Sequence, residues 1–216
     1  MGKNIIKHCI FIIFAVCAFT YIPIHAEEYG DIPNDWSRES VIWAYEQNIM
    51  TGSSGYIRPD DNINRAELAT MLVRLFDVQS TADIRHYTDV RQIDWYYPFI
   101  QKSVSADIMT GAYGQFRPMD TVTREEASVA IARAFDYKAR GNEAIQFNDC
   151  ESISGWARES VEALHERGIM MGDQTGNFCP GNKITRKEVA AILYRCKNRD
   201  ITPITDGDGT IWTPVY

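Results

Sequence analysis

The sequence predicts an all-α fold made of three copies of one helix–loop–helix unit. Trp36, Trp95 and Trp156 are each followed by a glycine sixteen positions later. Each copy then contains an arginine with a glutamate two positions further on, and the arginines recur at intervals of 59 and 62 residues. Apolar residues recur at helical spacing on both sides of the glycine. Repetition with such a period indicates an array of similar units.

The first helix of each unit begins near its tryptophan. In the first unit, Val41, Ala44 and Ile49 fall on one face of a helix. In the second unit, Pro98 lies in the first turn, where its missing N–H costs little. Twelve positions after each tryptophan lies a residue type that tolerates the left-handed conformation at helix ends. These residues are Asn48, Asp107 and Gly168.

The second helix of each unit opens with a capping box. An Asn or Thr should accept a hydrogen bond from a free N–H at the helix start, while a glutamate three positions later bonds back to the cap. The capping pairs are Asn64/Glu67, Thr123/Glu126 and Thr185/Glu188. Before each box lies a loop with glycine and proline, in which we expect the glycines to form turns. A single unit of this length buries little surface, so the three should share one core.

Two further features recur in every unit. An aromatic residue precedes the loop proline, which aligns Tyr56 with Phe116 and Phe178. An aspartate, two positions after another aromatic residue, precedes each tryptophan. These aspartates are Asp31, Asp89 and Asp149. We expect them to cap or brace the first helix, since carboxylates accept hydrogen bonds from the N–H groups at a helix start.

The first 26 residues have the pattern of a secretory signal peptide. Lys3 and Lys7 precede the uncharged run Cys9–Phe19, which is too short to span a bilayer of about 30 Å as a helix. Ala26 offers a small residue for cleavage. The alternative is an uncleaved anchor, because Ile24 is not the small residue usually preferred there. Cleavage would remove both lysines and change the formal charge from −7 to −9.

Composition excludes several classes of function. Apolar residues make up 45% of the chain and charged residues 24%, as in ordinary globular proteins. The net negative charge argues against a nucleic-acid partner. No Cys-x-x-Cys or histidine cluster occurs, so we expect no metal and no cofactor. His86 and His165 belong to no nucleophile motif, so we expect no catalytic residues. An exported chain could form at most one internal disulfide among Cys150, Cys179 and Cys196.

The combined pattern resembles the S-layer homology (SLH) repeat. In the first copy it reads Tyr29-x-Asp31, Trp36, Ile49-Met50-Thr51-Gly52, Tyr56-x-x-Pro59 and Ile63-Asn64-Arg65-Ala66-Glu67. The resemblance covers roughly residues 27–199 and implies repeat 1 at 27–84, repeat 2 at 85–142 and repeat 3 at 143–199. It also implies a pseudo-threefold spindle, with a central three-helix bundle and three prongs. We expect residues 200–216 to form a flexible tail, with Trp212 and Tyr216 exposed or docked.

The resemblance also implies a function at the cell wall or S-layer. SLH repeats attach proteins non-covalently to a surface glycopolymer, typically a secondary cell wall polymer with pyruvylated N-acetylmannosamine, or to modified peptidoglycan. The family motif Thr-Arg-Ala-Glu then makes Arg65, Arg124 and Arg186 the ligand-facing arginines. The accompanying candidates are Trp36, Trp95, Trp156, Gly52, Gly111 and Gly172. An arginine at a helix start lies beside free N–H groups and can bind a carboxylate with two bonds.

Three residues depart from the family motif. In the first copy, Asn64 stands where the family motif has threonine. In the second and third copies, Glu125 and Lys187 stand where the motif has alanine. A glutamate should repel an anionic ligand and a lysine should attract it. We therefore expect unequal grooves, with the groove of Arg124 least suited to an anion. The alternative function is a protein-interaction module of the cell envelope, whose partner would engage the grooves or the C-terminal tail.

Overall fold

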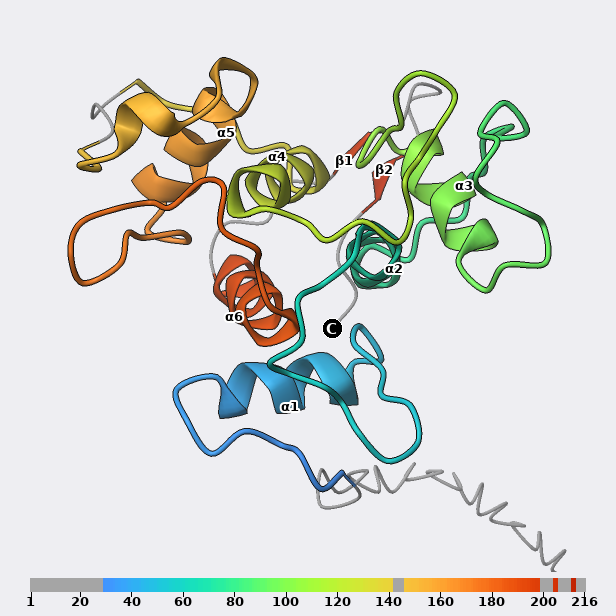
Figure 1. The fold of residues 1–216 in the computed structure, drawn as a ribbon, viewed down its shortest axis with the longest axis horizontal. Coiled ribbons are helices and arrows are strands. Elements are labelled where there is room, and N and C mark those ends of the chain that lie inside the picture. Colours follow the sequence, from blue (N-terminus) through green and yellow to red (C-terminus); the bar gives the residue numbers. More distant parts are fainter. Residues whose placement is uncertain (1–28, 142–145, 199–203, 206–210, 213–216) are drawn as a thin grey trace, which may run out of the picture.

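The computed structural model describes residues 29–141, 146–198, 204–205 and 211–212, so the expected signal peptide and Tyr216 lie outside the described residues. These residues form six α-helices, and the predicted all-α fold is confirmed (Figure 1). The first helices are α1 (Arg38–Glu46), α3 (Tyr97–Ser105) and α5 (Gly155–Glu166). The second helices are α2 (Arg65–Leu75), α4 (Arg124–Ala134) and α6 (Arg186–Lys197). The remaining elements are the 3₁₀ helix η2 (Cys150–Ser152) and the antiparallel strands β1 (Ile204–Thr205) and β2 (Ile211–Trp212).

The three second helices lie at the centre of the molecule, with the first helices around them (Figure 1). Each second helix packs against the first helix of another repeat: α2 against α3, α4 against α5, and α6 against α1. The contact of α6 with α1 joins the last repeat to the first and closes the ring. The apolar faces of all three repeats meet in one core, which includes Leu72, Ile131 and Leu193.

A closed triangle of backbone hydrogen bonds joins the residues just before the central helices. The N–H of Ile63 donates to the carbonyl of Ile184 at 3.0 Å, and the N–H of Ile184 donates to the carbonyl of Val122 at 3.1 Å. The N–H of Val122 completes the triangle by donating to the carbonyl of Ile63 at 3.0 Å. Each residue belongs to a different repeat, so the triangle holds the starts of α2, α4 and α6 together.

The local signals at the helix ends appear as the sequence predicts. Asn48, Asp107 and Gly168 have φ values of 55°, 51° and 60°, which confirms the left-handed ends of the first helices. At the start of α2, the side chain of Asn64 accepts from the N–H of Glu67, and Glu67 bonds back to the N–H of Asn64. The same reciprocal box opens α4 and α6.

The recurrent loop glycines are required by close packing. None of the three has a φ in the left-handed region, so the expected turn conformation is not the reason for glycine here. An aromatic ring of the same repeat lies against each one. The pairs are Gly52 with Tyr29, Gly111 with Tyr87 and Gly172 with Phe147. A Cβ at any of these positions would meet that ring and a loop carbonyl, so the space for a side chain is already filled.

The cysteines and the possible metal ligands were the subject of two expectations from composition. Within the described residues, no disulfide joins Cys150 or Cys179 to another cysteine, and Cys196 is buried in the core. The same residues contain no cluster of His, Cys, Asp and Glu that could hold a metal ion. No helix in this part of the chain has the length and apolar character needed to cross a membrane.

Candidate functional site

Each capping-box arginine reaches from its own repeat to the loop of another. Arg65 donates from Nε to the carbonyl of Phe116 and from Nη2 to the carbonyl of Thr110, both at 2.9 Å. The corresponding acceptors are Phe178 and Met171 for Arg124, and Ile57 and Thr51 for Arg186. Arg65 and Arg186 are only 8% and 3% exposed. These arginines therefore brace the repeats against one another, with part of each guanidinium already committed.

The N–H groups at the helix starts are also occupied. At the start of α2, the N–H of Arg65 donates to the carbonyl of Asp120 and that of Ala66 to the carbonyl of Pro118, at 3.0 and 2.9 Å. The equivalent acceptors are Asn182 and Pro180 for α4, and Asp61 and Pro59 for α6. The expectation of free N–H groups beside the arginines is therefore corrected, because the loop of a neighbouring repeat satisfies them.

The recurrent aspartates hold the loops instead of the first helices. The carboxylate of Asp31 accepts from the N–H groups of Ile57 and Arg58 at 2.8 and 2.7 Å. The equivalent donors are Phe116 and Arg117 for Asp89, and Phe178 and Cys179 for Asp149. The second donor of each pair has a φ of 57° or 58°, so the carboxylate stabilises a left-handed turn. Ile57, and not the exposed Tyr56, is thus the structural equivalent of Phe116.

Three of the pockets between the repeats contain one of the recurrent tryptophans, and we name each by its tryptophan. The Trp36, Trp95 and Trp156 pockets have volumes of about 340, 410 and 230 Å³. The three tryptophans are 63%, 54% and 60% exposed, so an indole face is available at each pocket. Gly52 and Gly172 line their pockets, whereas Gly111 lies next to a lining residue of the third.

Every pocket is assembled from all three repeats. In the Trp95 pocket, the tryptophan comes from repeat 2, Thr51 and Glu67 come from repeat 1, and Arg186 comes from repeat 3. The Trp156 and Trp36 pockets follow the same rule, with Arg65 and Arg124 as their capping-box arginines. The sequence-predicted tryptophans and arginines are therefore brought together, but each tryptophan meets an arginine of another repeat.

A second arginine in each pocket was missed by the sequence analysis. Arg74, Arg133 and Arg195 line the Trp95, Trp156 and Trp36 pockets. Each lies nine positions after a capping-box arginine, so the repeat register contained the signal. Arg133 and Arg195 are exposed. Arg74 is half-buried, and this burial lowers its pKa.

A third arginine is present in only two of the pockets. Arg58 lines the Trp95 pocket and Arg117 lines the Trp156 pocket. Glu67 accepts at Oε1 from Nη2 of Arg58 at 2.8 Å and from Nη1 of Arg186 at 3.0 Å. Burial lowers the pKa of Arg65, and the nearby charge of Arg117 lowers it further. Arginine keeps its charge in proteins despite such shifts, so these pockets hold closely spaced cations.

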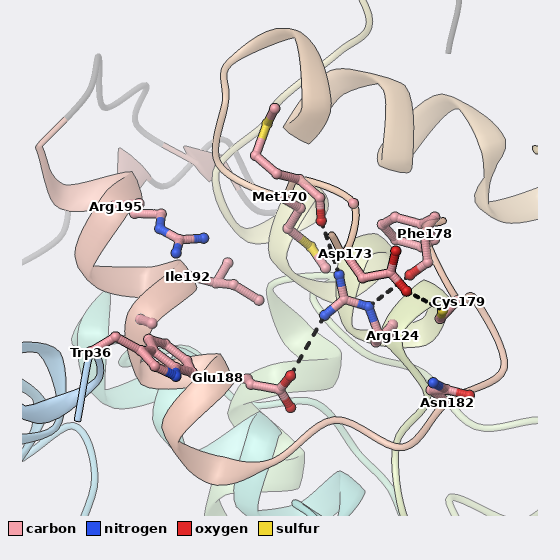
Figure 2. A pocket seen from close by; sticks show the side chains of 13 residues that line it. Trp36, Arg124, Met170, Asp173, Phe178, Cys179, Asn182, Glu188, Ile192 and Arg195 are labelled. Carbon is pink, nitrogen blue, oxygen red and sulfur yellow. Dashed lines mark hydrogen bonds and ion pairs between the residues drawn. The ribbon is translucent and has the colours of Figure 1, made fainter. Parts of the chain in front are cut away.

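The Trp36 pocket has a different charge pattern (Figure 2). Arg124 lies with Nη1 3.8 Å from Oε1 of Glu188, and Arg195 lines the opposite side of the pocket. Asp173 adds a second carboxylate, and Cys179 occupies the place of the third arginine. Hydrogen bonds lower the pKa of Asp173 to about 2, and the largest contribution comes from the Thr175 hydroxyl. The pocket is therefore formally neutral.

Two of the three motif departures, Glu125 and Lys187, make contacts other than the expected ones. Glu125 does not line the Trp36 pocket; its carboxylate accepts from the N–H and the hydroxyl of Ser154, at 3.0 and 3.1 Å, just before α5. Lys187 forms ion pairs of 2.9 Å with Asp35 and 2.6 Å with Asp60, both in repeat 1. The expectation that Glu125 repels an anionic ligand and that Lys187 attracts it is therefore corrected. Both side chains instead join neighbouring repeats.

Comparison with known proteins agrees with the repeat organisation. The pattern of the S-layer homology domain matches residues 28–69, 86–128 and 146–190. The chain is 32% identical over 171 residues to the exoglucanase XynX of Acetivibrio thermocellus, which covers 77% of the chain and 16% of that protein. The amylopullulanase of Thermoanaerobacterium thermosulfurigenes shows the same identity over 171 residues, covering 77% of the chain and 9% of that protein.

An S-layer protein is similar over a longer stretch. The chain is 28% identical over 188 residues to the S-layer protein sap of Bacillus anthracis, covering 84% of the chain and 23% of that protein. The chain thus spans less than a quarter of the length of each of these curated relatives. The three domain matches together cover more than half of the chain. The chain therefore belongs to the S-layer homology domain family, whose domains anchor proteins at the cell surface, and is a secreted cell-surface protein with three tandem copies.

Proposed function

We propose that the inter-repeat pockets bind an anionic glycopolymer of the cell wall and so hold the protein at the cell surface. One observation carries this proposal: each pocket combines an exposed indole face with at least two guanidinium groups. An indole face can pack against the apolar face of a sugar ring. A guanidinium binds a carboxylate with two parallel hydrogen bonds. A secondary cell wall polymer with pyruvylated N-acetylmannosamine offers both groups.

The charge of the chain makes the local cations decisive. The formal net charge is −7, so long-range attraction does not bring an anionic polymer to this protein. The arginines must act at short range, inside pockets where water screens their charge less than at the open surface. The glycosidases among the relatives are matched over 16% and 9% of their length, and the proposal assigns no catalytic step to this chain.

A sedimentation experiment with cell walls tests the proposal. The purified protein is mixed with walls that carry the polymer, walls from which the pyruvate has been removed, and walls stripped of carbohydrate. We expect sedimentation only with the first. Equal binding after removal of pyruvate would reject the role of the anion. Binding to walls that lack the polymer but retain peptidoglycan would favour peptidoglycan as the ligand. Binding to carbohydrate-stripped walls would favour an envelope protein as the partner.

Variants in the Trp156 pocket test the site itself. Arg65, Arg124 and Arg186 are unsuitable because they brace the repeats, so their loss would affect folding as well as binding. Trp156→Ala and Arg133→Gln change exposed side chains that line the pocket. We expect each to weaken wall binding by about tenfold, equivalent to about 1.4 kcal/mol. Arg85→Gln, which removes an exposed arginine outside the pockets, is the matched control and should bind as the unmodified protein does.

A further inference from the structure

The three pockets differ at two equivalent loop positions. The residue after the recurrent glycine is Ser53 in repeat 1, Ala112 in repeat 2 and Asp173 in repeat 3. The residue before the loop proline is Arg58, Arg117 and Cys179, in the same order. We infer that the Trp95 and Trp156 pockets take an anionic sugar residue, that the Trp36 pocket does not, and that these two positions set the difference. The inference rests on the proposed function and gives it a specificity.

The Trp156 pocket has an excess of positive charge in its lining, although Glu126 and Asp120 attract Arg65 at longer range. Arg65, Arg117 and Arg133 line it together with a single carboxylate, that of Glu126. Oε2 of Glu126 accepts a hydrogen bond from the N–H of Thr123 at 2.8 Å. Across the described part of the chain, no carboxylate oxygen lies within 4.0 Å of a nitrogen of these three guanidinium groups. A bound carboxylate would relieve the repulsion between Arg65 and Arg117.

The Trp95 pocket also carries an excess of cations. Arg58, Arg74 and Arg186 line it with Glu67 as the single carboxylate. Oε1 of Glu67 is shared between Arg58 and Arg186. Arg58 also pairs with Asp61, its Nη1 lying 3.6 Å from Oδ2 of that residue. With this carboxylate included, the pocket keeps an excess of one positive charge. Arg74 donates from Nη1 to the hydroxyl of Thr51 at 3.2 Å, and its guanidinium lies over the Phe99 ring, 5.1 Å from the ring centre.

The Trp36 pocket offers an anion no net attraction. Arg124 and Arg195 are balanced by Glu188 and Asp173 (Figure 2). Asp173 keeps its charge at neutral pH, because hydrogen bonds from Thr175 and Asn177 favour its ionised form. A sugar carboxylate in this pocket would meet that charge at close range.

Lys187 does not restore the balance of the Trp36 pocket. Its Nζ lies 5.8 Å from the centre of the Trp36 ring, so it is the nearest candidate for an additional cation. However, the same atom pairs with the carboxylates of both Asp35 and Asp60. The three charges together add no positive charge at the tryptophan. The deficit created by Cys179 therefore remains.

The loop backbone accepts either residue at the second position. Arg58, Arg117 and Cys179 share φ values of 57°, 58° and 58°. The N–H of Cys179 donates to Oδ2 of Asp149 at 2.8 Å, as the N–H of Arg58 does to Oδ2 of Asp31 at 2.7 Å. The two side chains are therefore exchangeable without a change in the turn, which makes a reciprocal swap a fair test.

The effect of the swap is measured as the number of probe molecules that each chain binds. The probes are the methyl glycoside of pyruvylated N-acetylmannosamine and the same glycoside without pyruvate, with native mass spectrometry and calorimetry on the full chain. We expect two sites for the pyruvylated probe in the unmodified chain. The double change Asp173→Ala with Cys179→Arg should give three sites, and Ser53→Asp with Arg58→Cys should leave one. Cys179→Ser, which removes the thiol without adding charge, is the control and should keep two.

The outcomes separate the inference from the proposed function. Three equal sites in the unmodified chain, or two sites after the double change in repeat 3, would overturn the inference while leaving the proposed function intact. No binding of the pyruvylated probe to the unmodified chain would reject both. Thermal melting checks that each variant folds. If a double variant unfolds, the single change Arg117→Cys in the Trp156 pocket decides the matter, because it should reduce two sites to one.

Discussion

Arg186 and Glu67 form an ion pair of 3.0 Å that joins the last repeat to the first. The guanidinium is almost fully buried, and it also donates to the carbonyls of Ile57 and Thr51 at 3.1 and 2.8 Å. Burial lowers the pKa of Arg186, while the charge of Glu67 opposes this shift. An arginine that lines one of the proposed binding pockets is thus also a main contact between two repeats.

Arg186→Ala should therefore reduce stability more than an exposed pocket arginine does. The change leaves two loop carbonyls without a donor and removes one of the two guanidinium partners of Glu67. We expect the free energy of unfolding to fall by about 2–4 kcal/mol, measured by urea denaturation. Arg133→Ala, in the Trp156 pocket but exposed, is the control and should cost about 1 kcal/mol or less. Equal losses for the two variants would contradict the bracing role.

Asp149→Asn tests the role of the recurrent aspartates. The carboxylate accepts from the N–H groups of Phe178 and Cys179 at 2.7 and 2.8 Å. An amide has only one acceptor oxygen, so one loop N–H would face an NH₂ group. We expect a loss of about 1–3 kcal/mol in urea denaturation. Asp83→Asn alters an exposed pair with Arg85 and should leave the denaturation curve unchanged.

Asp35 should make stability depend on pH in the acid range. Hydrogen bonds from the Ser37 hydroxyl and then from Lys187 lower its pKa from 3.8 to about 2. A lowered pKa in the folded state stabilises the protein above the unfolded value, and this contribution disappears as the pH falls toward 2. The melting temperature of Asp35→Asn should therefore lie below that of the unmodified protein at neutral pH. The gap should close between pH 4 and pH 2, as followed by circular dichroism; a gap that widens in acid would refute the assignment.

Two glycine substitutions should have opposite effects. In Gly111→Ala the new Cβ would meet the Tyr87 ring and the carbonyl of Gln115, so we expect a loss of about 1–3 kcal/mol. In Gly155→Ala, at the first position of α5, the new Cβ meets nothing within 4 Å. Alanine restricts the unfolded chain there and should stabilise by about 0.4–1 kcal/mol. Calorimetric melting of both variants gives the comparison, and a stable Gly111→Ala would show that the loop can move.

The features that depend on residues close together in the sequence were predictable. The capping box of Thr123 and Glu126 spans three positions, and the left-handed end at Asn48 depends on one residue type. The contacts between repeats were not, since the carbonyl of Phe116 that binds Arg65 lies 51 positions away. Glu125 illustrates the same limit, because its partner Ser154 precedes a helix of the next repeat.

The candidate site was predictable in its parts but not in its assembly. The tryptophans and capping-box arginines were identified from their recurrence, but no local pattern indicates that Trp95 shares a pocket with Arg186. That pairing follows from the closed order of the helix contacts. The sequence shows that repeat 3 has Cys179 where the other repeats have Arg58 and Arg117. Its effect on the charge of the pocket could be inferred only once the structure placed this position in the pocket lining.

Because each pocket draws on all three repeats, the number of complete pockets does not scale with the number of copies. A chain that lost repeat 2 would lose Trp95 from one pocket, Arg124 from another and Thr110 from the third. Deletion of one copy would thus damage every pocket instead of removing a third of them. For the same reason, one additional copy would have no partners with which to complete a pocket. In such an arrangement a set of three repeats is the smallest unit that forms a complete pocket.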